Sequence, residues 1–264
     1  MRAPAESSKP VVAESAEPRP FFVQIGGAFL YPLKGNGPWL ILGYVLFMIA
    51  SYLLSYAQGT GATILSLLIP SYLCAYVFKI VLTTADGEAE PPDWPDFAHF
   101  WEEIVQPAGL FIGSLLFCAL PAIAYAISKV SFSDEGDPHF NGSMHMVRSL
   151  LVVGCVFLPM AVLSAAMHDS LRGLNPLLIL GAIIKIPLQY AVAVMALLLV
   201  LALSVAAGSL LQIPLVSIVA YCAIVLYAMM VEARIIGLIY AANATRLNWF
   251  DEASDRRRDS QKVH

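Results

Sequence analysis

The sequence predicts an all-α fold: a polytopic membrane helix bundle with six transmembrane helices and short interfacial amphipathic helices beside them. Composition is the first observation, because 59% of the 264 residues are hydrophobic and only 13% are charged, whereas about a quarter are charged in soluble domains. The second is a mean hydropathy of +0.73, spread over apolar stretches of about the 20 residues that a spanning helix needs. The length of the chain suits one membrane domain with short tails.

Both ends of the chain are polar. Residues 1–20 are rich in Ala, Pro, Ser and Glu and lack the apolar core of a signal peptide, so we expect a disordered cytoplasmic tail. Residues 251–264 are charged and form a second predicted cytoplasmic tail. The six-span membrane domain covers residues 21–250. It begins with Phe21 to Tyr31, which is too short to span and is predicted to be an interfacial helix.

Six apolar stretches are long enough to cross a bilayer. They are residues 39–56, 63–83, 107–127, 146–167, 188–207 and 214–233. With six spans, 13 of the 15 Lys and Arg residues fall on the side that holds both tails, and only Lys129 and Arg148 fall on the other. Because basic residues concentrate in cytoplasmic loops, both termini are predicted to be cytoplasmic.

Prolines and glycines inside the predicted spans shape the expected bundle. Pro70, Pro121 and Pro159 each remove an intrahelical hydrogen bond and should bend a helix. Bent helices build ion sites in some transporters, but proline is also commoner in membrane helices than in soluble ones, and both interpretations stay open. Gly109 and Gly113 form a GxxxG pair, which is predicted to let another helix pack closely.

The most concentrated polar feature lies between Ala85 and Pro107, where seven acids occur without any Lys or Arg. The loop ends in a stretch with apolar residues at helical spacing, from Phe97 to Gln106. We expect this stretch to be a helix lying flat on the cytoplasmic surface, bounded by Pro95 and Pro107. The side chains predicted to be buried beneath it are Phe97, Phe100, Trp101 and Ile104.

Three uses of the acidic loop are open: a solvated connector, a docking site for a basic segment, or a metal site. The basic segment would belong to a partner or to the chain's own Arg256–Arg258. The prolines between the acids do not leave the fixed ligand spacing of a calcium loop, so no metal is predicted. The residues predicted to bind a partner are Glu88, Glu90, Asp93, Trp94, Glu102 and Glu103.

Four charged residues lie inside or at the edge of apolar stretches: Lys79, Lys185, Glu232 and Arg234. Charges within membrane segments are costly and are candidates for function. The predicted spans put all four near the cytoplasmic interface and none near the middle of the bilayer, which argues against an ion-coupled pump. Glu232 is expected to pair there with Lys79 or Lys185, because an unpaired carboxylate close to hydrocarbon is costly.

The sequence offers weak signals for catalysis. His168, Asp169 and Ser170 are consecutive, whereas a catalytic triad is recognised by side chains that converge in space. HExxH, GxSxG and P-loop motifs are absent from the sequence. The outer loop 134–145, with His139 and His145, is either a solvated loop or a divalent-metal site. We therefore expect no enzyme activity and no cofactor.

Three short motifs carry a resemblance to a known family. They are Gly87-Glu88 with Pro91-Pro92-Asp93-Trp94, the Asn175-Pro176 connector, and Gly237-Leu-Ile-Tyr240 with Leu247-Asn-Trp249. From Phe21 to Phe250 the chain resembles an uncharacterised domain-of-unknown-function family of six-span bacterial membrane proteins. The resemblance implies the six-span topology and a bacterial inner membrane, and it implies no catalytic residues.

These observations lead to a first functional hypothesis and two alternatives. The first is a non-enzymatic inner-membrane protein, an accessory, scaffolding or membrane-organising subunit that binds a protein partner, or acts as a homo-oligomer, through its acidic loop. The alternative is a small transporter or lipid-handling protein built on proline-bent helices, which should have polar groups near the middle of the bilayer. An integral lipid enzyme using His168 and Asp169 comes third. The lipid bilayer is the expected environment, and no nucleic-acid partner is expected.

Overall fold

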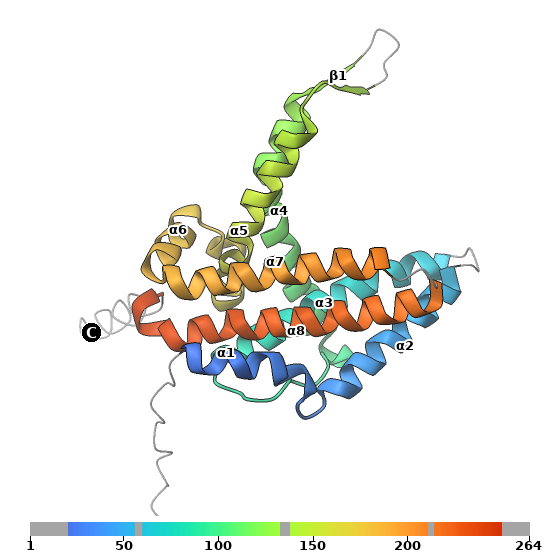
Figure 1. The fold of residues 1–264 in the computed structure, drawn as a ribbon, viewed down its shortest axis with the longest axis vertical. Helices are drawn as coiled ribbons and strands as arrows, with labels where there is room; N and C mark the ends of the chain where they lie inside the picture. Colours follow the sequence, from blue (N-terminus) through green and yellow to red (C-terminus); the bar gives the residue numbers. More distant parts are fainter. Residues whose placement is uncertain (1–20, 56–59, 133–137, 211–213, 250–264) are drawn as a thin grey trace, which may run out of the picture.

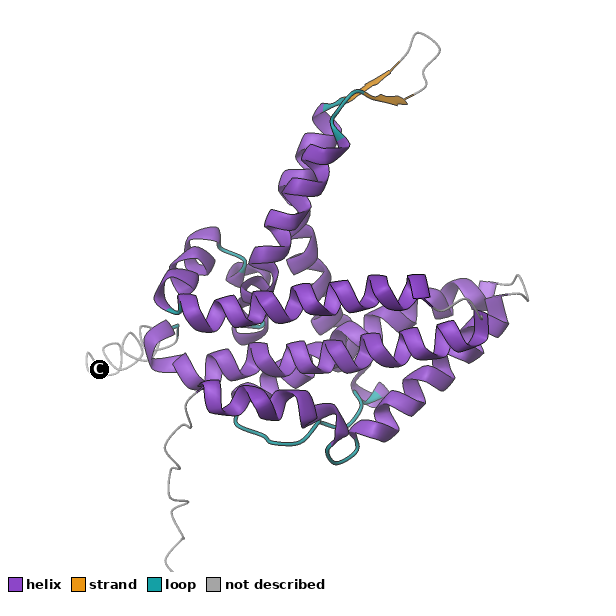
Figure 2. Ribbon diagram, viewed as in Figure 1, coloured by secondary structure: helices purple, strands orange, loops and turns teal. Residues whose placement is uncertain are grey.

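A computed structural model describes residues 21–55, 60–132, 138–210 and 214–249. The predictions of two disordered tails, at 1–20 and 251–264, lie outside the described residues. Within the described part, the chain is almost entirely helical, which confirms the all-α fold class (Figure 2).

The α-helices are α1 (Phe21–Leu30), α2 (Gly37–Ser55), α3 (Thr60–Ala85), α4 (Gln106–Ser128), α5 (Met144–His168), α6 (Pro176–Lys185), α7 (Pro187–Leu210) and α8 (Pro214–Leu247). Short helical turns are η1 (Tyr31–Leu33), η2 (Phe97–His99), η3 (Trp101–Val105) and η4 (Leu171–Gly173). Two short strands, β1 (Val130–Phe132) and β2 (Pro138–Phe140), pair antiparallel with Val130 opposite Phe140. This small hairpin was not expected.

Prolines begin three of the helices: α6, α7 and α8 start at Pro176, Pro187 and Pro214. A proline suits the first helical position because its fixed φ is already helical and its missing N–H would have had no intrahelical acceptor. The Asn175 side chain caps α6 by accepting a hydrogen bond of 3.0 Å from the backbone N–H of Leu177. Asp169, with φ of 45°, ends α5 in the left-handed conformation.

Four described helices are long and apolar enough to cross a membrane: Trp101–Ser128, Met144–His168, Pro187–Ala206 and Val219–Leu247. A fifth candidate is the pair Phe21–Leu33 and Gly37–Ala50, which is bent by 52°. The chain is therefore a multi-pass membrane protein, and the count of six spans stays a prediction. The segment from Phe21 that we expected to lie in the interface is a helix, and the structure joins it to α2 as this bent pair.

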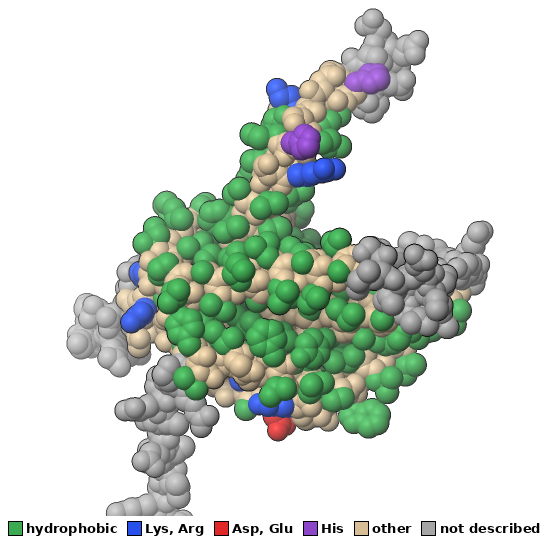
Figure 3. All heavy atoms as spheres, in the orientation of Figure 1, with side chains coloured by type: hydrophobic (Ala, Val, Ile, Leu, Met, Phe, Trp, Pro, Cys, Tyr) green, Lys and Arg blue, Asp and Glu red, His purple; other side chains and the backbone are tan. Residues whose placement is uncertain are grey.

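Helix α8 is the centre of the body, where it packs against α1, α2, α3 and α7 (Figure 1). Helices α4 and α5 pair with each other and leave the body as a hairpin that carries β1 and β2 at its far end. The hairpin runs across the direction of α7 and α8 rather than along it. Hydrophobic side chains cover most of the visible face of both parts (Figure 3), which suits a lipid environment.

The prediction of a separate surface helix from Phe97 to Gln106 is wrong, because this stretch continues into α4. The chain runs from η3 directly into α4, and Pro107 lies in the first turn of α4, where proline is tolerated, instead of ending a separate helix. Ile104 is buried, but Phe100 is 41% exposed and Trp101 is 68% exposed. The side chain of Phe97 lies outside the described residues. The apolar stripe therefore forms the entrance to a spanning helix, not the underside of a surface helix.

Candidate functional site

Residues 86–96, which we call the acidic strap, fold back along α3 and are held there by aromatic residues of that helix. The Trp94 ring stacks on Tyr72 and Tyr76, with ring centroids 5.2 and 5.5 Å apart. The strap prolines Pro91, Pro92 and Pro95 are buried. A proline has no backbone N–H, so these residues are buried without leaving a backbone donor unpaired.

Side-chain donors from the body hold the carbonyl groups of the strap. The Tyr72 hydroxyl donates to the carbonyl of Pro95 at 2.8 Å, the Tyr76 hydroxyl to that of Pro92 at 3.2 Å, and the Tyr31 hydroxyl to that of Glu90 at 3.3 Å. The Arg234 guanidinium donates to the carbonyl of Glu88. The backbone of the strap is thus fixed at four positions although it contains no regular secondary structure.

The six residues predicted to bind a partner fall into two groups. Trp94 packs against the body, Asp93 accepts a hydrogen bond of 3.0 Å from the Asn36 side chain, and Glu103 forms a 3.1 Å salt bridge with Lys79. Glu103 also accepts a 2.8 Å hydrogen bond from the backbone N–H of Asp96. These three residues have structural roles. The side chains of Glu88, Glu90 and Glu102 are exposed and accept none of these bonds, so they are the ones that a partner could bind without breaking a contact described above.

The predicted pairing of Glu232 with Lys79 or Lys185 is wrong, because both bases are bonded elsewhere. Lys79 bonds to Glu103, and the Lys185 ammonium donates to the carbonyl of Leu247 at 3.2 Å, at the carboxyl end of α8. Arg234 lies 4.8 Å from the centre of the Tyr31 ring and donates to the Thr84 hydroxyl at 3.0 Å. The predicted set of interface charges is therefore not one network.

Glu232 itself is buried without a partner. The residue is 7% exposed, and neither carboxylate oxygen accepts a hydrogen bond from any residue that the structure describes. Helix α8 continues beyond the predicted span 214–233 to Leu247, and Glu232 falls halfway along the 29-residue candidate span Val219–Leu247.

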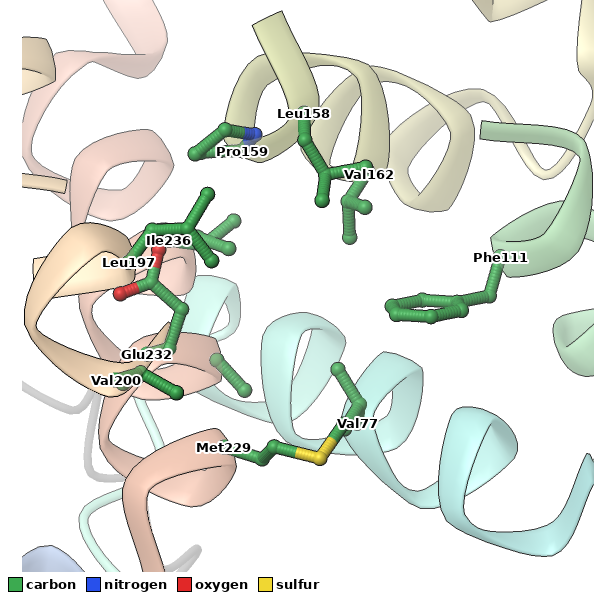
Figure 4. Close-up of a pocket in the computed structure, with 11 residues that line it drawn as sticks. Val77, Phe111, Leu158, Pro159, Val162, Leu197, Val200, Met229, Glu232 and Ile236 are labelled. Carbon is green, nitrogen blue, oxygen red and sulfur yellow. The ribbon is translucent and has the colours of Figure 1, made fainter. Parts of the chain in front are cut away.

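Glu232 lines a cavity of about 80 Å³ at the junction of five helices (Figure 4). The other lining residues are apolar: Val77 of α3, Phe111 of α4, Leu158, Pro159 and Val162 of α5, Leu197 and Val200 of α7, and Met229, Ala233 and Ile236 of α8. Figure 4 shows the Glu232 carboxyl group and the Phe111 ring on opposite sides of this space. Pro159, one of the prolines identified in the sequence, has no N–H to bond the preceding turn of α5.

A second cavity of about 340 Å³ lies among α4, α5 and α6. Its lining is apolar apart from the thiol of Cys118, and it includes Phe117, Pro121, Phe157 and Ile179. Nothing in this lining would orient a polar ligand. The Glu232 cavity is smaller, and it alone of the two holds an ionisable carboxyl group.

The three consecutive residues considered for catalysis point to different partners. The His168 ring bonds to the carbonyl of Ser164 at 2.8 Å, and the Asp169 carboxylate accepts from the Gln106 amide at 2.9 Å. The Ser170 hydroxyl accepts from the backbone N–H of Arg172 at 3.2 Å. The structure therefore does not bring these side chains into one site. Among the described residues, no group of three or more His, Cys, Asp or Glu side chains is placed to hold a metal ion.

Of the predicted pair of packing glycines, Gly113 has a close neighbour and Gly109 has none within 4 Å among the described residues. Gly113 faces the Leu171 side chain of η4, and Gly109 has no heavy atom within 4 Å of the position that a Cβ would take. Helices also approach closely at Gly154, which faces the carbonyl of Cys118, and at Gly237, which faces Thr84 of α3. Gly237 belongs to one of the motifs that carried the family resemblance, and that motif was the available signal for it.

Comparison with known proteins identifies the family. A family model described as "Protein of unknown function (DUF4013)" matches residues 59–213. Comparisons with the curated proteins and with solved structures gave no match. The matched region runs from the beginning of α3 to the end of α7, so it contains the acidic strap and the cavity walls from α3, α4, α5 and α7, and α8 with Glu232 follows it. Because the match covers more than half of the chain, the protein belongs to the DUF4013 family.

Proposed function

We propose that the protein is a small transporter or lipid-handling protein that binds a ligand between its helices at the Glu232 cavity. The observation that carries this proposal is a buried carboxyl group without a hydrogen-bond partner among the described residues, on a residue that lines an otherwise apolar cavity. The sequence had favoured an accessory subunit because no ionisable group was expected near the middle of a span. The unpartnered carboxyl group of Glu232, halfway along the candidate span Val219–Leu247, supports the transporter or lipid-handling alternative instead.

The free energy of burial explains why this arrangement points to a ligand. A buried polar group without a hydrogen bond costs about 1–3 kcal/mol in proteins, and an ionised one costs more. A methionine or leucine at position 232 would fill the same space without this penalty. A carboxyl group in an apolar cavity is therefore useful when something else supplies its partner, and ligand sites characteristically combine apolar walls with a few polar groups.

The topology belongs to the same proposal. Six spans in a bacterial inner membrane, with both termini in the cytoplasm, agree with the 13 to 2 distribution of basic residues. In this orientation the acidic strap faces the cytoplasm, and Glu232 lies close to it, two residues before Arg234, which bonds to the strap carbonyl of Glu88.

Co-purification tests the proposal while the ligand is still unidentified. Wild type, Glu232→Gln and Glu102→Gln would be purified in a mild detergent, extracted with organic solvent, and compared by untargeted mass spectrometry of small molecules and lipids. We expect at least one species that is present with the wild type and with Glu102→Gln, whose side chain is exposed, and depleted with Glu232→Gln. Extracts that do not differ among the three proteins would contradict the proposal.

A partner-binding role for the acidic strap is the second candidate, and the rigid attachment of the strap favours it. A loop fixed at four carbonyl groups presents Glu88 and Glu90 in one arrangement, which lowers the entropy cost of binding a basic segment. Replacing Glu88, Glu90 and Glu102 with Gln should then release a basic partner, and salt should weaken its binding. Glu103 is left unchanged because it is bonded to Lys79. Retention of every partner by the triple variant would reject this role.

A further inference from the structure

Building on the proposed function, we infer that the ligand of the Glu232 cavity is a small organic monocation, an ammonium group with short apolar substituents. Charge is the first reason. Among the described residues, Glu232 is the one charged side chain that lines the cavity, and the walls from α3, α4, α5 and α7 contribute only apolar side chains. The described bases Lys79 and Arg234 bond to Glu103 and to Thr84. When Glu232 is ionised, a ligand must therefore bring the positive charge that pairs with it.

The number of oxygen ligands argues against a metal ion. Calcium takes six to eight oxygen ligands, and magnesium requires six in octahedral geometry, whereas Glu232 is the one oxygen-bearing side chain among the described residues that line this cavity. An ammonium group needs far less: a carboxylate accepts its N–H bonds or neutralises its charge, and aliphatic walls accept its substituents. Phe111 adds an aromatic ring on the side opposite Glu232, and aromatic rings attract organic cations through their π faces.

The volume of the cavity limits the part of the ligand that lies inside it to a few heavy atoms. One water molecule needs about 10–15 Å³ by the measure that gives this cavity about 80 Å³. The cavity therefore admits roughly five to eight atoms of that size. A primary ammonium with a four-carbon chain fits this limit. A phospholipid headgroup with its glycerol does not fit, although the alkylammonium end of a longer molecule does.

Binding is coupled to one proton. Without a ligand, an ionised Glu232 would have no partner in an apolar cavity, so the carboxyl group carries its proton. When the cation binds, the O–H bond of Glu232 breaks, the proton leaves to water, and the carboxylate pairs with the ammonium. The Tyr190 hydroxyl of α7 takes no part, because it donates to the carbonyl of Val156. One cation thus replaces one proton, which is the stoichiometry of an exchanger.

Direct binding of simple probes tests the inference. Purified protein in detergent would be titrated with n-butylammonium and with 1-butanol, a neutral molecule of the same size, and the thermal unfolding midpoint would be recorded. We expect n-butylammonium to raise the midpoint of the wild type and 1-butanol to have little effect. Lowering the pH by one unit should weaken butylammonium binding about tenfold, because proton and cation compete for one group.

Variants connect the signal to the cavity. Glu232→Gln should abolish the response to butylammonium, Phe111→Leu should weaken it several-fold, and Asp86→Asn, whose side chain is exposed, should leave it unchanged. Equal responses to both probes, retained in Glu232→Gln, would overturn the cation assignment while leaving a ligand site in place. Absence of any response in the wild type would also overturn it. The co-purification experiment then shows separately whether the proposed function fails as well, because it compares extracts of the wild type and Glu232→Gln without assuming a cation. If Glu232→Gln does not fold, the probe comparison and the pH dependence of the wild type still decide.

Discussion

Glu232 and Glu103 show how strongly the surroundings of a carboxyl group decide its role. Glu103 lies at the entrance to α4, where it accepts bonds from Lys79 and from the backbone of Asp96. Glu232 lies within α8 without a described partner. Both are acids close to apolar stretches in the sequence. The bonds of Glu103 stabilise the folded protein, whereas a buried carboxyl group without a partner, like that of Glu232, lowers its stability.

Replacing Glu232 with Met should therefore stabilise the protein in the absence of ligand. Methionine fills a similar volume and removes an unpaired buried carboxyl group, so we expect the free energy of unfolding to rise by about 1–3 kcal/mol. The measurement is unfolding in mixed micelles followed by circular dichroism. Glu103→Met is the matched control, and it should destabilise because it breaks a salt bridge and a backbone hydrogen bond. A less stable Glu232→Met would indicate a structural partner for the carboxylate.

At the scale of elements, the acidic strap depends on one aromatic side chain. Trp94→Ala would remove the stacking on Tyr72 and Tyr76, each contact worth about 0.5–1.5 kcal/mol beyond its buried area. We expect the strap to become sensitive to a protease that cleaves after acidic residues, while the helical circular dichroism is unchanged. Trp101→Ala is the control, because Trp101 is exposed and its loss should not alter cleavage. Equal protection of both variants would show that the strap does not need Trp94.

Close packing of α3 on α8 requires the absence of a side chain at Gly237. A Cβ there would overlap Thr84 and the carbonyl of Val81, so Gly237→Ala should destabilise by about 1–3 kcal/mol. Gly109→Ala should be neutral or stabilising, because its Cβ would meet no atom within 4 Å and alanine favours a helix over glycine by about 1 kcal/mol. Unfolding of the two variants under the same conditions separates packing from helix propensity. Similar effects of both substitutions would be inconsistent with the close contact at Gly237.

At the scale of the whole molecule, the proposed orientation in the membrane rests on the distribution of the basic residues. In a background without the native cysteines, Ala89→Cys in the acidic strap and His145→Cys near the tip of the α4–α5 hairpin should react with an impermeant thiol reagent from opposite sides. Intact cells should label position 145, and inverted membrane vesicles should label position 89. Labelling of both positions from one side would reject the predicted topology.

Local sequence patterns were sufficient to predict the helices, because a helix depends on residues that are close together in the chain. Apolar stretches of about 20 residues predict spanning helices because lipid offers no partner to an unpaired backbone, and α3, α4, α5, α7 and α8 all cover their predicted stretches. The family resemblance was also correct, since the motifs Gly87-Glu88 and Asn175-Pro176 lie within the matched residues. Proline at the beginning of a helix was harder to interpret, and Pro107 was wrongly expected to end one.

Partners of charged side chains depend on how helices pack, and the sequence could not assign them. Lys79 has Glu103 within reach because α3 packs beside η3, and Lys185 caps α8 because α6 ends near Leu247. The same packing leaves Glu232 facing a cavity, and it directs the α4–α5 hairpin across α7 and α8. By itself, then, the sequence determined the helical, membrane-embedded class and most helix positions, through hydropathy and local sterics. Only the tertiary structure decided which acid is paired and which faces a cavity, because these depend on contacts between residues far apart in the chain.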